Sequence, residues 1–413
     1  MTAPPPTSNG GKLRIAVLGV GADPGARARH FLATIARLTD HYELAAICDR
    51  SPDVLAEVGA LYGVPGQYAD VRTLFANEQP DVVLSLTPKD SHIVMALTAA
   101  RHGCHIITEI PVALTRRHAA AIAETCRENG VLWEVAEQVW LWPRERLKRQ
   151  IIDAGLLGAV THARLWYQTG QYHGFSGIRA LIGAPAARVL GYCGEVPTEP
   201  YIAYGGEPEN SLKWDSGVIE FANGVACLFE KPPRVFPSSH ITFPTGWEIE
   251  GTKGNLSRDV LVQYLEGRSL TFPIQEHYME RDGAQVLESL SVATDPPVVW
   301  ENPYNRYGIA TQDDAAKADI LTSFHTAITM GEKPQYGVAE GVRDYELCLA
   351  VRESADRGNT WVELPLTDPT ALEEQIEAEF LRRYGHDPIE ETDALLDATF
   401  TRSATLWPFA HWL

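Results

Sequence analysis

Residues 13–25 read LRIAVLGVGADPG, an apolar run that ends in a cluster of glycines. The run at 13–18 is typical of a buried strand, and Gly19, Gly21 and Gly25 follow it. Glycines let a backbone approach a pyrophosphate closely, and a helix that begins after them presents free N–H groups and the positive end of its dipole. The spacing differs from G-x-G-x-x-G because Pro24 holds the sixth position. The stretch predicts a phosphate-binding loop between a strand and a helix; the alternative is a tight strand–helix turn without a ligand.

The sequence that follows alternates apolar runs with helical patterns. The apolar runs lie at 44–48, 82–86, 105–108 and 132–136, and the helical patterns at 26–38, 54–62, 92–102 and 114–128. Such alternation predicts a parallel sheet with right-handed crossovers. We therefore expect a doubly wound Rossmann domain over residues 12–143. A lead-in rich in Pro, Ser and Gly, expected to be disordered, precedes it at 1–11.

The pattern changes after Pro143. A helical pattern over 144–154 precedes alternating runs at 160–168, 217–221, 225–230 and 247–250, with turns rich in Gly and Pro between them. These runs predict an open, mostly antiparallel sheet. The expected fold class is α/β plus α+β. We expect the sheet domain, with helices at 315–330 and 338–357, to occupy 144–365, and a helical, finally aromatic tail to occupy 366–413.

The chain of 413 residues is acidic, with 54 Asp and Glu against 35 Lys and Arg and a formal net charge of −19. Such a surface repels nucleic acid and anionic membranes, so neither is an expected partner. No apolar stretch is long enough to span a bilayer, and the N-terminus lacks the pattern of a signal peptide. The six cysteines are scattered without a C-x-x-C pair. We expect a cytoplasmic protein with reduced thiols and no metal site.

Asp49 ends the second apolar run, which is where a carboxylate accepts the ribose 2′-hydroxyl of NAD. Arg50 follows it, and an arginine there either pairs with the 2′-phosphate of NADP or stacks on adenine. A carboxylate beside that phosphate would repel it, so we predict NAD as the cofactor. Glu137 and Gln138 end a further strand on the same side, and we expect them to contact the ribose or the substrate.

Three further motifs accompany the glycine loop: TPKDSH at 87–92, EIP at 109–111 and WEIEGTKG at 247–254. In this order the motifs resemble the Gfo/Idh/MocA oxidoreductases, the glucose–fructose oxidoreductase and inositol dehydrogenase superfamily, from about Lys12 to Pro365. The resemblance implies a Rossmann domain and an open-faced sheet domain, with a small sugar substrate between the sheet and the nicotinamide. It adds Thr87, Pro88, His92, Glu109 and Pro111 to the expected cofactor-binding residues. For Glu109 the alternative is that it caps the helix beyond Pro111.

The chain departs from that family at its proton-handling groups. Ile110 stands where the family usually has the lysine of Glu-Lys-Pro, and Thr169 and Ser176 stand where it tends to have aspartates. Alignment of Arg179, Leu181 and Gly183 with the family's following helix places His173 at the family's histidine. The NAD-dependent glycosidases of the superfamily are similar here, since they carry a small apolar residue between Glu and Pro and a His-Gly start to the later helix, as in His173-Gly174.

That resemblance implies glycoside cleavage by a transient redox cycle. In this cycle a ring hydroxyl, usually at C3, is first oxidised to a ketone, which acidifies the neighbouring C2–H. The aglycone then leaves C1 by elimination. Water adds, and the ketone is reduced again. Such chemistry needs positioned acids and bases. His173 is the first candidate because imidazole titrates near neutrality, and Tyr172 and Tyr167 are candidate relays or sugar ligands. The alternatives are a plain NAD-dependent sugar or polyol dehydrogenase, and an inactive NAD-binding sensor or scaffold.

Weaker expectations concern the helix that starts the second domain and the assembly. Trp140 and Trp142 either stack on a sugar or pack in a core. Four basic residues on the helix are expected to form a solvated face: Arg144, Arg146, Lys148 and Arg149. Because an exposed apolar sheet face is an association site, we expect a homo-oligomer. The aromatic tail at 406–413 is too apolar to remain free, so it docks on its own chain or on a neighbouring subunit.

Overall fold

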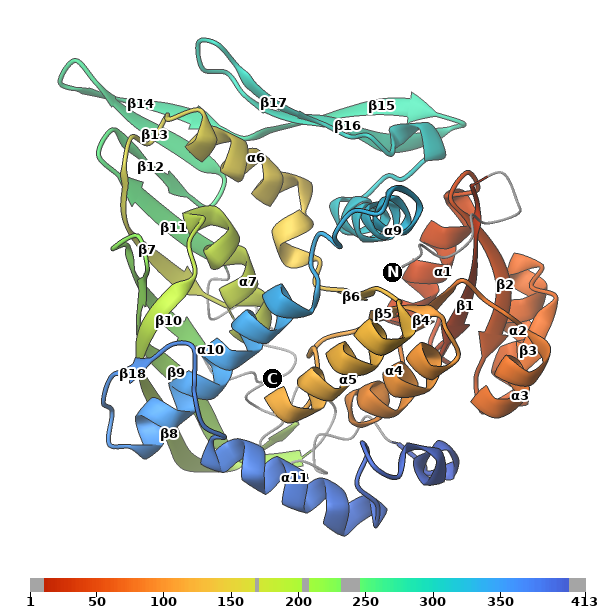
Figure 1. Ribbon diagram of the computed structural model, residues 1–413. Coiled ribbons are helices and arrows are strands. Elements are labelled where there is room, and N and C mark those ends of the chain that lie inside the picture. The colour runs from red at the N-terminus through yellow and green to blue at the C-terminus, as the bar shows by residue number, and fades with distance from the viewer. Residues whose placement is uncertain (1–10, 168–170, 203–207, 232–245, 401–413) are drawn as a thin grey trace. The chain divides into compact units, whose positions relative to one another are not determined.

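The computed structural model describes residues 11–167, 171–202, 208–231 and 246–400 (Figure 1). These residues form two compact units. The first comprises 11–137, 304–342 and 375–400, and the second comprises the described parts of 138–303 together with 343–374. Helices α10 (Val338–Asp356) and α11 (Ala371–Tyr384) each contain a boundary between the units.

The first unit contains a six-stranded parallel sheet in the order β3-β2-β1-β4-β5-β6. Its strands are β1 (Leu13–Leu18), β2 (Tyr42–Cys48), β3 (Gly66–Tyr68), β4 (Val82–Ser85), β5 (His105–Thr108) and β6 (Trp133–Val135). This order is that of a dinucleotide-binding Rossmann sheet, in which the carboxyl ends of the strands form the binding edge. The prediction of a doubly wound parallel sheet is confirmed.

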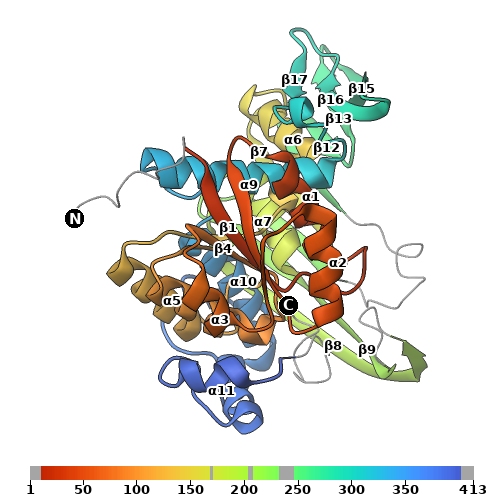
Figure 2. The same ribbon diagram turned by 90° about the vertical axis from the view of Figure 1, so that its right-hand side faces the viewer.

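Helices connect these strands. They are α1 (Arg27–Arg37), α2 (Pro52–Tyr62), α3 (Val71–Asn77), η1 (Lys89–Ser91), α4 (His92–Arg101) and α5 (Arg116–Asn129). Figure 2 shows α2 and α5 on opposite sides of β1 and β4. Helix α2 starts after Ser51, whose side chain accepts the Val54 N–H, and ends at Gly63 with a φ of 65°. Only glycine adopts such a left-handed C-cap at little cost.

Two later segments complete the first unit. The first segment carries η3 (Asn305–Tyr307) and α9 (Gln312–Met330). Helix α9 packs on α1, and the Tyr42 hydroxyl donates to the Leu321 carbonyl oxygen at 2.7 Å. The second segment, 375–400, ends with the short helix η4 (Thr392–Asp397), which packs on α4. The sequence predicted the helix at 315–330 but assigned it to the sheet domain; in the structure it packs in the nucleotide-binding unit.

The second unit contains a nine-stranded sheet in the order β14-β13-β12-β11-β7-β10-β9-β8-β18. Its strands are β7 (Val160–Trp166), β8 (Ala186–Ile202), β9 (Pro208–Phe221), β10 (Ala226–Lys231), β11 (Gly246–Gly251), β12 (Gly254–Ser257), β13 (Val260–Leu265), β14 (Arg268–Pro273) and β18 (Val362–Glu363). All neighbours pair antiparallel except β7 and β10. The prediction of an open, mostly antiparallel sheet is therefore confirmed.

A three-stranded sheet and two helices accompany the large sheet. The small sheet contains β15 (Gln275–Arg281), β16 (Ala284–Val292) and β17 (Val298–Glu301). The helices are α6 (Pro143–Asp153), preceded by η2 (Val139–Leu141), and α7 (Gln171–Ile182). Helix α7 lies close to the large sheet because two glycines face it: a Cβ on Gly174 would come within 2.8 Å of Tyr167 Cβ, and a Cβ on Gly177 within 2.5 Å of the Trp247 ring.

In the described part of the chain, no helix is both long and apolar enough to cross a bilayer. The six cysteines are all free, and five of them are buried. Three parts of the sequence-based predictions lie outside the described residues: residues 1–10 of the lead-in expected at 1–11, Thr169, and the aromatic tail at 406–413.

Candidate nucleotide and substrate sites

The glycine loop that follows β1 has the geometry that its sequence predicts. Gly19 and Gly21 have φ values of 78° and 74°, which favour glycine. A Cβ on Gly19 would lie 3.1 Å from the Leu86 carbonyl oxygen, and a Cβ on Gly21 2.7 Å from the Ala26 Cβ. Gly25 has no positive φ; its N–H donates to Asp23 Oδ1 at 2.8 Å. The first two glycines are thus required by the backbone, whereas the third is not.

Helix α1 begins after this loop with an N-terminus suited to an anion. Its N-cap is Ala26, and among the described residues no side chain caps the helix and no acidic residue lies in its first turn. The exposed N–H groups of such a helix end attract a phosphate. The residues therefore fit the pyrophosphate of a dinucleotide.

Asp49 lies at the carboxyl end of β2, where the sequence predicts a ribose ligand. Its Oδ2 accepts the Val20 N–H at 3.0 Å, and its Oδ1 accepts the Ser51 N–H at 3.1 Å. The carboxylate thus joins the glycine loop to the start of α2. Asp49 also lines a pocket of about 430 Å³, a size within the range of small-molecule sites.

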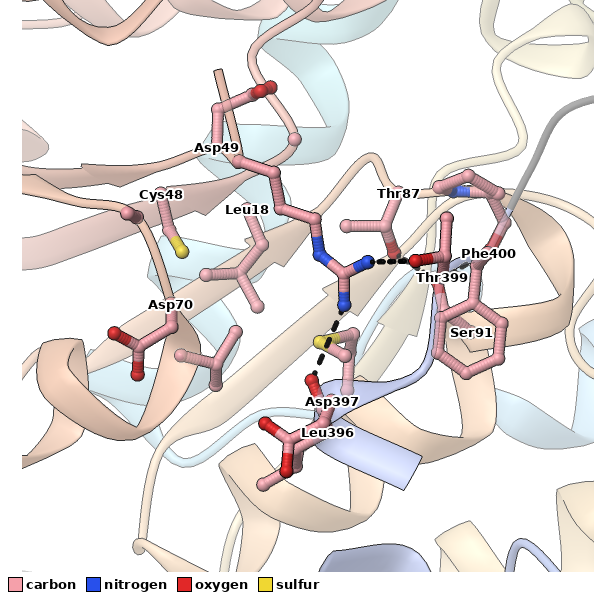
Figure 3. Close-up of a pocket in the computed structure, with 16 residues that line it drawn as sticks. Leu18, Cys48, Asp49, Asp70, Thr87, Ser91, Leu396, Asp397, Thr399 and Phe400 are labelled. Carbon is pink, nitrogen blue, oxygen red and sulfur yellow. Dashed lines mark hydrogen bonds between the residues drawn. The ribbon is translucent and has the colours of Figure 1, made fainter. Parts of the chain in front are cut away.

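The pocket lies along the strand ends and brings several predicted residues together (Figure 3). Those that line it are Gly19, Asp49, Arg50, Thr87 and Pro88. Among the lining residues that sequence reasoning missed, four come from a segment late in the chain: Leu396, Asp397, Thr399 and Phe400. Nothing local in the sequence at 392–400 indicates a nucleotide site, because the segment joins the pocket only through tertiary packing.

His92 lies behind the pocket rather than in it. Its side chain is 1% exposed, and its ring nitrogens lie 3.2 Å from the Pro111 carbonyl oxygen and 3.1 Å from the Thr87 carbonyl oxygen. Burial lowers the pKa of His92, so the ring is neutral near pH 7. His92 therefore links the loops that follow β4 and β5 through the carbonyl groups of Thr87 and Pro111.

Glu109 does not cap a helix. Its carboxylate forms an ion pair with Arg27, the first residue of α1, and also accepts the Ile110 N–H at 3.2 Å. Arg27 Nη2 donates to the Ala136 carbonyl oxygen at 3.2 Å, so one guanidinium connects α1 with the ends of β5 and β6. Sequence reasoning missed Arg27; the available signal was a lone cation directly after the glycine loop. Glu137 and Gln138 are both buried.

In the second unit, His173 lies in the first turn of α7 and is partly exposed. Its ring centroid lies 6.2 Å from that of Tyr167, and Tyr167 in turn stacks on Trp247 with centroids 5.8 Å apart. Tyr167 is 4% exposed and Tyr172 is 1% exposed. The structure thus brings His173 and Tyr167 together, and it places both tyrosines inside the core, with His173 as the accessible member of the three.

Sequence reasoning missed a buried carboxyl group near the start of α7. Asp215 on β9 is 1% exposed and accepts the Gln171 Nε2–H at 2.7 Å, while Lys231 Nζ lies 4.0 Å from the same oxygen. Burial raises the pKa of Asp215 to about 6, although Lys231 acts in the opposite direction. The available signal was the position of an acidic residue in register with Ile219 and Phe221, on the apolar face of the strand.

The basic residues of α6 do not form a solvated face, so that expectation was wrong. Lys148 is 4% exposed, and its ammonium group forms an ion pair with Glu145 at 2.9 Å. The Glu145 carboxylate also accepts the Trp247 indole N–H at 2.8 Å. The Arg146 guanidinium lies 4.7 Å from the Trp140 ring centroid, a cation–π contact. Arg144 and Arg149 pair with acidic residues of the same unit. These contacts hold α6 in place within the second unit.

Comparison with known proteins supports the nucleotide site. A family model described as "Oxidoreductase family, NAD-binding Rossmann fold" matches residues 13–137. A D-apiose dehydrogenase of Rhizobium rhizogenes is 32% identical over 135 residues, which cover 32% of this chain and 39% of that protein. A glycosyl hydrolase family 109 protein of Shewanella pealeana is 27% identical over 164 residues, which cover 38% of this chain and 35% of that protein. The chain thus spans less than half the length of these relatives.

The fold extends beyond the matched domain. The crystal structure of an oxidoreductase domain protein from Kribbella flavida aligns with a TM-score of 0.64 and 20% identity, covering 86% of this chain and all of that one. At this identity the likeness concerns the fold alone. The family model, in contrast, covers the glycine loop, Asp49 and Glu109, and with them the predicted NAD site. Residues 13–137 thus match the NAD-binding domain of the Gfo/Idh/MocA oxidoreductase family, as the sequence motifs predict.

Proposed function

We propose that the chain is an NAD-dependent enzyme that acts on a sugar or glycoside and cleaves a glycosidic bond by transient oxidation of a ring hydroxyl. The names of the relatives support both halves of this proposal, since one is a sugar dehydrogenase and the other a glycosyl hydrolase. The observation that carries it is the partly exposed His173, held beside Tyr167 in a chain that has Ile110 in place of a lysine.

Oxidation of a ring hydroxyl removes a hydride from carbon and a proton from oxygen. NAD supplies the hydride acceptor when it is bound. His173 accepts the proton, because an imidazole exchanges protons near neutral pH and Ile110 is unable to do so. Tyr167, wedged between His173 and Trp247, orients the imidazole. For the buried Tyr172, a relay role remains a prediction.

Cleavage needs a second proton-handling group, because C2–H must be removed and the leaving oxygen protonated. Asp215 is suited to this role: its pKa of about 6 lies near working pH, and Gln171 joins it to the same helical turn that carries His173. Water then adds and the ketone is reduced, so the net reaction is hydrolysis without net oxidation. This second group favours cleavage over simple dehydrogenation.

Two other functions remain as alternatives. A plain sugar or polyol dehydrogenase would use His173 alone and release NADH with each turnover. An inactive NAD-binding sensor or scaffold would bind the nucleotide and turn over no glycoside. The accumulation of NADH separates the first alternative from cleavage, and the absence of any turnover identifies the second.

Deuterium incorporation tests the proposal. A panel of aryl glycosides is incubated in deuterium oxide with catalytic NAD, and released sugar and NADH are measured. We expect released sugar with deuterium at C2 and no net NADH. The variant His173→Ala should lose both cleavage and exchange by about 10²–10⁴-fold, as is typical for removal of a positioned acid or base.

The control is His277→Ala, which removes an exposed histidine of β15 in the same unit and should leave cleavage unchanged. Stoichiometric NADH with an intact glycosidic bond would establish the dehydrogenase instead. Full activity in His173→Ala would show that the proton is handled elsewhere.

A further inference from the structure

We propose that residues 392–400, here called the C-terminal segment, belong to the nucleotide site and make it selective for NAD over NADP. The segment forms one wall of the pocket beside Asp49. It also holds the Arg50 side chain away from the position of the ribose 2′ group. The ligand class is a dinucleotide with a free ribose 2′-hydroxyl. This inference concerns nucleotide binding and does not rest on the reaction proposed above.

The first observation is the place of the segment. Leu396, Asp397, Thr399 and Phe400 line the same pocket as Asp49 (Figure 3). The pocket keeps about 430 Å³ with the segment in position, which is enough for a small-molecule ligand. The segment is therefore a wall of the pocket rather than a plug in it.

The second observation is the orientation of Arg50. Its Nη1 donates to Thr399 Oγ1 at 3.1 Å, and its Nη2 donates to the Leu396 carbonyl oxygen at 3.4 Å and also to the Ala398 carbonyl oxygen. An arginine near this strand end is the residue that accommodates a 2′-phosphate in NADP-binding relatives of the Rossmann fold. Here the N–H groups of the Arg50 guanidinium donate to the C-terminal segment, so this cation is not directed to the 2′-phosphate that NADP would bring.

The third observation is that other contacts fix the segment. Arg72 of α3 pairs with Asp397 at 2.6 Å and donates to the Asp393 carbonyl oxygen at 2.7 Å. Leu395 is fully buried, and the Phe400 and Tyr384 rings lie 4.9 Å apart. Because these anchors do not involve Arg50, the segment is in place to receive the arginine.

The charges of the residues that line the pocket also favour NAD over NADP. Asp49, Asp70 and Asp397 all line the pocket, and Arg50 brings the only guanidinium or ammonium group among the described lining residues. Like charges repel, so a 2′-phosphate placed among three carboxylates is disfavoured once Arg50 is directed elsewhere. Neutral ribose hydroxyls suffer no such repulsion and donate hydrogen bonds to carboxylates.

Equilibrium binding tests the inference without any turnover. Dissociation constants for NAD and NADP are measured by titration calorimetry on the full chain and on Arg72→Ala, which releases the segment. We expect weaker NAD binding by roughly 5-fold or more, the lower end of a typical coupling between sites, and tighter NADP binding. Arg127→Ala is the control, because it removes another exposed, ion-paired arginine, and neither Arg127 nor its partner Glu124 on the same helix lines the pocket.

Two further variants keep the test decisive. Thr399→Val removes the side-chain acceptor of Arg50 without touching the Arg72 anchor, so it should shift the NADP to NAD ratio in the same direction even if Arg72→Ala fails to fold. In the double variant Arg50→Ala/Arg72→Ala the gain in NADP binding should vanish, because the freed arginine causes it. Unchanged constants in Arg72→Ala and Thr399→Val would overturn the inference, and tighter NAD binding in either would show that the segment competes with the nucleotide.

Discussion

The guanidinium of Arg27, in the first turn of α1, forms an ion pair with the carboxylate of Glu109 at the end of β5. The same side chain reaches the Ala136 carbonyl oxygen beyond β6. One cation therefore fixes the helix that follows the glycine loop against two neighbouring strand ends. A nucleotide site of this kind depends on the spacing of its strand-end loops, and this contact sets that spacing on one side of β1.

Arg27→Ala should destabilise the first unit and weaken NAD binding together. The substitution leaves the Glu109 carboxylate, which is 14% exposed, without its cation. We expect a loss of about 1–3 kcal/mol in the free energy of unfolding, the usual cost of removing a charged hydrogen-bond partner. Denaturant titration measures it. The double variant Arg27→Ala/Glu109→Gln should recover part of the loss, and a native-like stability of Arg27→Ala would disprove the structural role.

Asp49→Ala should weaken NAD binding and relax the preference for NAD over NADP. We expect the dissociation constant for NAD to rise about 10-fold or more, because the predicted ribose contact and the hydrogen bonds from Val20 and Ser51 all disappear. Asp49→Asn separates the two effects, since it keeps an acceptor oxygen and removes the charge. The control is Asp53→Asn, an exposed residue at the start of α2. If the native protein bound NADP as tightly as NAD, the assignment of the cofactor would be wrong.

Asp215 should make the stability of the protein depend on pH. Its folded pKa of about 6 lies above the usual value of 3.8, so the folded state holds the proton more tightly than the unfolded state. The stabilisation from Asp215 is thus fully present below about pH 4 and is lost as the pH rises through about 6. Between about pH 4 and 6, the free energy of unfolding of the native chain should fall by up to about 3 kcal/mol relative to that of Asp215→Asn. Urea unfolding at several pH values measures the difference.

The reference variant for that experiment is Glu199→Gln, an exposed carboxylate of β8 whose neutralisation should leave the pH profile of stability unchanged. If the free energy of unfolding changed with pH in the same way for the native chain and for Asp215→Asn between pH 4 and 6, the raised pKa of Asp215 would be disproved.

The outer face of the large sheet should carry a subunit contact. Leu228 on β10 is 53% exposed, and Tyr192 and Tyr264 are each 46% exposed on other strands of the same sheet. Apolar side chains exposed across a sheet favour association. We expect an oligomeric mass by light scattering at micromolar concentration, and a smaller mass for Leu228→Glu. Leu61→Glu, on the exposed face of α2, is the control; a native chain that is strictly monomeric would refute the oligomer.

The sequence indicated those parts of the fold that local pattern determines. The strand at 105–108 was predicted with its observed bounds. The helical patterns expected at 54–62 and 114–128 correspond to α2 and α5, whose C-caps Gly63 and Gly130 adopt a left-handed conformation that favours glycine. The short strand β3 and the long strand β8 were missed, since their exposed polar residues weaken the alternation. The family resemblance, the fold class and NAD were confirmed.

The parts that were missed depend on contacts between distant residues. Lys148 looks like a surface lysine until Glu145 and Trp247 are placed beside it. Asp215 becomes unusual only when Gln171 and Lys231 surround it. Neither environment is encoded within a window of neighbouring residues, so periodicity and spacing do not reveal it.

The return of residues 375–400 to the first unit has a consequence for how the protein is made. The last strand of the parallel sheet ends at Val135, but η4 and the partners of Arg50 lie some 260 positions further along. At roughly 5–20 residues per second, a ribosome needs tens of seconds to add them. Throughout that interval the nascent Rossmann sheet lacks the wall beside Asp49. Selective binding of the dinucleotide therefore begins only after η4 has been made, and a chain interrupted before η4 would bind NAD weakly and fail to discriminate against NADP.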